Sequence, residues 1–121
     1  MLKWYSAHAI MFMKFQDGNQ DIYRIMENVI LISAETDEEA QKKVGKRARK
    51  DEVGTDRDYT YDGRPVTWEF VGLRKLISCV FPEEHPDDGT ELTYSEMEVA
   101  DKESFDKLVN GDIVTVVYYD A

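Results

Sequence analysis

Apolar and polar residues alternate over residues 2–15, where every second residue from Tyr5 to Phe15 is apolar. The intervening positions, from Trp4 to Lys14, mix aromatic, polar and charged side chains. A period of two residues predicts a half-buried strand. Residues 21–34 are rich in Ile and Val and follow a turn-forming stretch that contains Gly18, so we expect a hairpin of two long strands.

The segment after Thr36 is predicted to form a helix. Thr36 can accept a hydrogen bond from the N–H of Glu39, and the Glu39 side chain then completes a capping box. Basic residues dominate the second half of this segment and favour the C-terminal end of a helix, where the dipole is negative. Small apolar residues recur every four positions and suit close packing on a sheet; they are Ala40, Val44 and Ala48.

Four more strands and a second helix are predicted in the rest of the chain. An Asp62-Gly63 turn joins a short strand to a long one. Asp101 is expected to cap the second helix, which Asn110-Gly111 ends. The last strand is apolar on both faces, as is typical of an inner strand. The strands are expected at residues 59–61, 66–81, 90–99 and 113–119.

The resulting order, β-β-α-β-β-β-α-β, predicts an α+β fold. Its form is a curved, mostly antiparallel sheet with helices packed on one face. A chain of 121 residues fits a single domain, 1–121. An apolar content of 42% is enough for a packed core.

The net charge of −10 belongs entirely to the last third of the chain. Residues 1–82 hold 13 acidic and 13 basic residues, whereas residues 83–121 hold 12 acidic residues and two lysines. Nucleic-acid binding needs a positive surface and is therefore disfavoured. A basic protein partner is the better hypothesis. The residues expected to contact it are Glu91, Glu96, Glu98 and Asp101.

The basic run from Lys42 to Lys50 has three interpretations. A solvated helix face is the simplest, and a weak RNA contact is the second. In the third, this helix faces the acidic segment of a second copy, which favours a homodimer.

Residues 79–92, "CVFPEEHPDDGTEL", collect the only cysteine, a histidine and several carboxylates. Structural zinc sites use paired Cys or Cys/His ligands at short spacing, which this chain lacks. Alternation along residues 66–81 instead turns Cys79 toward the core, on one face with Val71, Leu73, Ile77 and Phe81 and with Lys75 as the only break. The segment is predicted to be an acidic loop, and no metal or cofactor is assigned.

Asp17, Asn19 and Asp21 have the spacing of a calcium loop, but the glycine and glutamate that complete such a loop are missing. A hairpin turn accounts better for these residues.

An aromatic surface offers the alternative function. Trp4, His8 and Trp68 are the candidates for a pocket on the sheet face, in a small-molecule binder or enzyme. No nucleophile or second carboxylate is identifiable beside His8. No phosphate loop, nucleophile elbow or metalloprotease motif is found either. The sequence therefore assigns no catalytic residue and disfavours an enzyme.

The longest apolar stretch, Trp4–Phe15, is shorter than the ~20 residues of a membrane span. It also lacks the cleavage site of a secretory signal. A single cysteine fits a reducing compartment. We therefore expect a cytoplasmic protein without a membrane segment.

Four stretches together resemble one family of small bacterial proteins. They are "WYSAHAIMFM", "ENVILISAETDEEAQKKV", "WEFVGLRKLISCV" and "DGTELTYSEMEV". The family is domain of unknown function 4288, and the resemblance implies a bacterial, cytosolic, single-domain protein without known activity, cofactor or site residues. The first functional hypothesis is thus a non-catalytic protein-binding or regulatory module, such as an immunity-type inhibitor that covers the positive cleft of a nucleic-acid enzyme.

Overall fold

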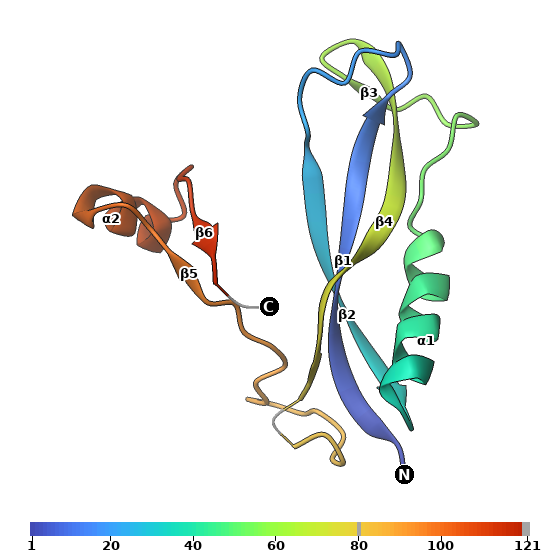
Figure 1. Ribbon diagram of the computed structural model, residues 1–121, viewed down its shortest axis with the longest axis vertical. Coiled ribbons are helices and arrows are strands. Elements are labelled where there is room, and N and C mark those ends of the chain that lie inside the picture. Colours follow the sequence, from blue (N-terminus) through green and yellow to red (C-terminus); the bar gives the residue numbers. More distant parts are fainter. Residues whose placement is uncertain (80, 120–121) are drawn as a thin grey trace.

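The computed structural model describes residues 1–79 and 81–119. Its elements follow the predicted order β-β-α-β-β-β-α-β, which confirms the α+β class. Figure 1 shows a long, twisted antiparallel sheet with the first helix on one side. The elements are β1 (Lys3–Phe15), β2 (Ile25–Ala34), α1 (Asp37–Arg49), β3 (Thr60–Tyr61), β4 (Arg64–Ser78), β5 (Met97–Glu98), α2 (Lys102–Asn110) and β6 (Val117–Tyr118).

Strand β1 is the centre of the main sheet. The strand order is β2-β1-β4-β3 with antiparallel neighbours, so β2 is an edge strand. The predicted first hairpin is confirmed, although β2 begins at Ile25 rather than at residue 21. Strands β5 and β6 form a separate two-stranded sheet.

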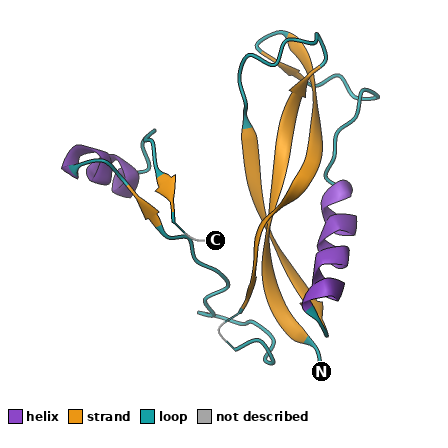
Figure 2. Cartoon of the chain, viewed as in Figure 1, coloured by secondary structure: helices purple, strands orange, loops and turns teal. Residues whose placement is uncertain are grey.

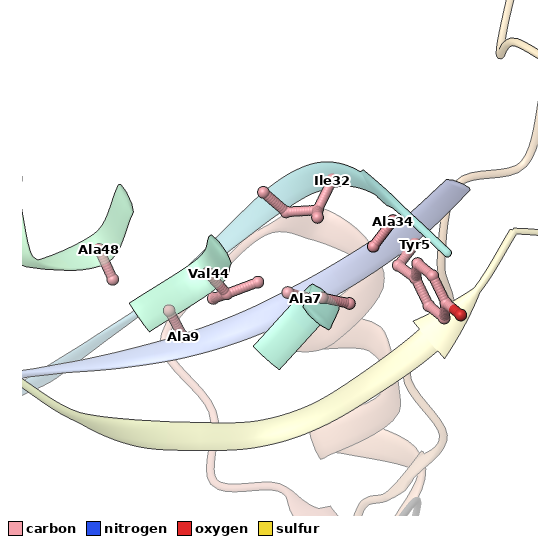
Figure 3. Close-up of a cluster of buried hydrophobic side chains, with 8 residues drawn as sticks. Tyr5, Ala7, Ala9, Ile32, Ala34, Val44 and Ala48 are labelled. Carbon is pink, nitrogen blue, oxygen red and sulfur yellow. The ribbon is translucent and has the colours of Figure 1, made fainter. Parts of the chain in front are cut away.

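Helix α1 covers one face of the sheet, against β2, β1 and β4. Thr36 caps it, since its hydroxyl accepts from the N–H of Glu39 at 3.1 Å. The Glu39 carboxylate accepts from the N–H of Glu35, so the capping box closes one residue earlier than expected. Small side chains on both elements let helix and sheet approach closely. The buried cluster between them, shown in Figure 3, consists of Tyr5, Ala7, Ala9, Ile32, Ala34, Ala40, Val44 and Ala48.

Two irregularities in β4 reverse the expected direction of its side chains. The register passes from Lys75 opposite His8 to Leu73 opposite Ala9, and it shifts again between Ile10 and Met11. Each extra residue moves the following side chains to the other face. The predicted common face of β4 is therefore wrong. Leu73 packs toward α1, while Lys75 lies on the opposite face of the sheet.

The C-terminal third also differs from the predicted strands. The expected strand at 90–99 is reduced to Met97–Glu98, and the expected inner strand at 113–119 is reduced to Val117–Tyr118. The second helix is confirmed, with Asp101 accepting from the N–H of Ser104 at 2.8 Å. Its C-cap, Gly111, has a φ of 79°, a left-handed conformation that favours glycine.

Helix α2 does not pack on the sheet. Figure 2 shows it with β5 and β6 on the far side of the molecule from α1, and it lies close to no other helix or strand of the described residues. The expectation of helices on one sheet face therefore holds for α1 alone.

Candidate functional site

The sheet face opposite α1 carries a buried histidine. His8 is only 2% exposed. Its Nδ1 atom lies 2.5 Å from Oε2 of Glu27 in β2, and its Nε2 atom lies 2.6 Å from Oγ1 of Thr93. Both ring nitrogens are thus occupied by groups of the chain itself, which leaves His8 no free nitrogen for a substrate.

Glu27 joins this histidine to an arginine. Arg74 Nε donates to Oε1 of Glu27 at 3.0 Å, and its Nη2 atom donates to Oε2 at 3.0 Å. Burial by itself raises the pKa of Glu27, but the hydrogen bonds from Arg74 and His8 outweigh it and hold the pKa below its usual value. The carboxylate is therefore charged at neutral pH.

Polar side chains of β1 and β4 bind residues 92–95, which we call the strap, to this face of the sheet. Ser6 donates to the carbonyl of Leu92, and His8 binds Thr93. The Lys75 ammonium donates to the carbonyl of Tyr94 and lies 4.9 Å from its ring centroid. Arg74 reaches Oγ of Ser95 at 3.4 Å. Each of the four strap residues is therefore held by a side chain of β1 or β4.

Cys79 is buried under this strap. Its Sγ atom lies 3.7 Å from the carbonyl oxygen of Leu92 and 3.8 Å from Oγ of Ser6. The thiol is therefore inside the protein, as expected, but against the strap rather than on the α1 side. His85, in the acidic loop, makes an edge contact with Trp4 at 4.7 Å between ring centroids. Among the described residues, no three His, Cys, Asp or Glu side chains are placed to hold a metal ion.

Of the residues expected to line an aromatic pocket, Trp4 lies on the same sheet face as His8, but Trp68 does not. Trp68 pairs with Met13, which is five residues from His8 along β1, so the two side chains point to opposite sheet faces. Trp68 packs beside Met13 and Phe15 instead.

The calcium-like turn is organised by an arginine. Arg64 donates to both carboxylate oxygens of Asp17, at 2.7 and 3.0 Å, and to Asp21 at 2.9 Å. It also donates to the carbonyl of Asn19 at 2.6 Å. A guanidinium thus binds all three residues with calcium spacing, and the hairpin interpretation is confirmed.

Three of the four acidic residues expected to contact a partner lie on residues 96–119, which we call the C-terminal unit. Asp101 is the helix cap, and Glu98 accepts from the hydroxyl of Tyr119 at 3.3 Å. Glu96 is exposed. Glu91 lies outside the unit, in the loop that also holds His85.

The apolar residues of the C-terminal unit are largely uncovered, a feature that the sequence pattern did not indicate. No described residue from Phe81 onward is buried. The unit meets the sheet through Arg74, whose guanidinium lies 4.3 Å from the ring centroid of Tyr118. The exposed apolar residues are Phe105, Leu108, Val109, Ile113, Val117, Tyr118 and Tyr119.

Comparison with known proteins identifies a family but no close relative. No curated protein and no solved structure matches the chain. Neither helix of the described chain has the length and apolar character needed to cross a membrane. The family model of DUF4288, described as a domain of unknown function, matches residues 4–95 and so ends where the strap ends. The chain therefore belongs to the DUF4288 family, with the C-terminal unit beyond the matched residues.

Proposed function

We propose that this protein is a non-catalytic protein-binding module that docks on a basic partner surface through its C-terminal unit. The observation that carries the proposal is the absence of any buried residue among residues 96–119, despite their apolar content. A segment of this size cannot form a core of its own, and a hairpin of two short strands is only marginally stable in water. A partner surface would supply the missing cover.

The apolar side chains of the unit provide the binding energy. Phe105, Leu108 and Val109 follow the spacing of one helix face, and Ile113 is 99% exposed. Burying one such side chain contributes about 1.5–3 kcal/mol. Because Phe105 and Leu108 are already about half covered, the four together contribute roughly 4–8 kcal/mol before the cost of association.

The charge of the unit selects the partner. Residues 96–119 contain six acidic residues and two lysines, a net charge of −4. An acidic surface with an apolar centre suits a basic partner, because complementary fields speed association and exclude acidic competitors. The positive cleft of a nucleic-acid enzyme has this chemistry, and an immunity-type inhibitor is the corresponding role.

The polar network supports the non-catalytic part of the proposal. His8 is covered and bound at both nitrogens, and Cys79 is covered by the strap. These groups instead bind the strap, which precedes the C-terminal unit, to the sheet.

A pull-down from lysate of the native host at low and high salt tests the proposal. The charge variant is E96K/E98K/E103K, which spares the capping residue Asp101. The matched control is E83K/E84K/D88K, which makes the same charge change in the acidic loop. The apolar variant is F105Q/L108Q/V109Q, since Gln preserves helix propensity.

A partner should be retained by the wild type and the control, released by salt, and lost by both variants. Equal retention by all four proteins would overturn the proposal. So would the absence of any retained protein and of any self-association.

A further inference from the structure

A basic groove runs along the free edge of the main sheet, between β2 and α1. Because β2 is an edge strand, its outer side has no strand neighbour in the described chain. The floor is apolar, because Ile30 and Ile32 turn their side chains toward α1. The side chain of Leu31, which is 40% exposed, points to the opposite face of the sheet. The groove is lined by Ile30, Leu31, Ile32, Lys43, Lys46, Arg47 and Lys50. The groove thus joins a free strand edge to four basic side chains, of which Arg47 is paired with Asp51 at 2.9 Å.

The C-terminal unit has the complementary properties. Three of the four residues 113–116 are apolar, namely Ile113, Val114 and Val116, yet the strand pairing of the unit begins only at Val117. Asp112 directly precedes this stretch, and Asp106 is exposed on α2. Within the described part of the chain, residues 113–116 thus form an apolar segment without a paired strand, preceded by one carboxylate and near a second on α2.

The unit of the same chain is held away from this groove. The strap fastens it to the sheet face opposite α1 through Thr93 and Ser95. Figure 1 shows α1 and the C-terminal unit on opposite sides of the sheet. A second copy does not have this restriction.

We infer that the partner of the C-terminal unit is a second copy of this chain, in whose β2–α1 groove the unit docks. Residues 113–116 lie along the free edge of β2, and the acidic residues of the unit face the lysines of α1. The C-terminal unit of each copy docks in the β2–α1 groove of the other, so the two copies form a two-fold dimer with two equal contacts. The inference rests on the proposed function and names the partner of the same unit.

A charge-exchange experiment with the full chain tests the inference. The groove variant is K46E/K50E, and the unit variant is D106K/D112K; all four residues are exposed. The matched control is K42E/R49E, which makes the same charge change on the other side of α1. Mass is measured by light scattering across concentration, and circular dichroism checks that every variant is folded.

We expect the wild type and the control to have twice the monomer mass of 14.1 kDa. Each charge variant alone should dimerise at least ~tenfold more weakly, and an equimolar mixture of the two should restore the dimer, because both contacts then pair opposite charges. A monomeric wild type, or a mixture no stronger than its parts, would overturn the inference.

The pull-down described above shows whether a wrong dimer inference also means that the proposed function is wrong. A monomeric wild type that still retains a basic partner, which both unit variants lose, overturns the inference while the proposed function stands. A monomeric wild type that retains nothing overturns both.

Discussion

The guanidinium of Arg74 in β4 lies 4.3 Å from the ring centroid of Tyr118 in β6, while it also binds both carboxylate oxygens of Glu27. One side chain thus joins the polar network of the sheet to the C-terminal unit. The bulge that places Arg74 outside the regular register directs it to this side. The bulge in β4 therefore determines where the C-terminal unit contacts the sheet.

Replacing Tyr118 with Leu should loosen the unit without unfolding the sheet. A cation–π contact at an exposed site contributes about 0.5–1 kcal/mol, so the change in the free energy of unfolding should stay within ~1 kcal/mol. Amide relaxation by NMR should show greater mobility confined to residues 96–119. Unchanged relaxation there would contradict the anchoring role of Arg74.

Replacing Arg74 with Met should destabilise the whole domain. The Glu27 carboxylate, whose side chain is 21% exposed, would lose two hydrogen bonds from a charged donor. A loss of about 2 kcal/mol is expected in urea unfolding. The E27Q/R74M double variant should recover part of that loss, because no charge is then left unpaired; a double variant less stable than R74M would argue against the pairing.

Glu27 should make the free energy of unfolding depend on pH in the acidic range. Its pKa in the folded state is held below its usual value of 4.5. The carboxylate therefore stabilises the fold fully above that value, and this contribution is lost as the pH falls through the lower, folded-state pKa. Urea unfolding of wild type and E27Q should differ most above pH 4.5, and the difference should shrink as the pH falls below that value. A difference that is constant with pH would refute the assignment.

Arg64 should control the ionisation of Asp17. The hydrogen bonds from Arg64 lower the pKa of Asp17 from 3.8 to about 2. In R64Q the pKa of Asp17 should return toward 3.8, as measured by carboxyl carbon shifts in an NMR titration. The stabilising contribution of Asp17 is present above 3.8 and lost toward pH 2, so R64Q should flatten this part of the acid profile. An unchanged titration of Asp17 would show that Arg64 does not bind it in solution.

The close contact between α1 and the sheet should reject larger side chains. Ala40 is fully buried against β1 and β2. Ala40→Leu should cost about 1–3 kcal/mol in urea unfolding because the added atoms force the helix outward. Gln41→Leu, at an exposed position of the same helix, is the control and should change stability little. Equal stability of the two variants would mean that the helix does not pack closely there.

Several features of this fold follow from local sequence alone. The alternation in β1, the Thr36 and Asp101 caps, the small-residue stripe of α1 and the left-handed Gly111 were all predicted and are all found. Each depends on residues within a few positions of one another, where hydrogen-bonding chemistry and side-chain period leave few alternatives.

Tertiary structure alone decided the surroundings of the candidate residues. His8 meets partners 19 and 85 positions away in the chain. The shifted register of β4 turned Lys75 and Cys79 to the strap side, because one extra residue reverses every later side chain. The last segment carries the pattern of an inner strand, and an inner position requires neighbours on both sides. Sequence determines that the segment is apolar; only the assembled fold determines whether a neighbour is there.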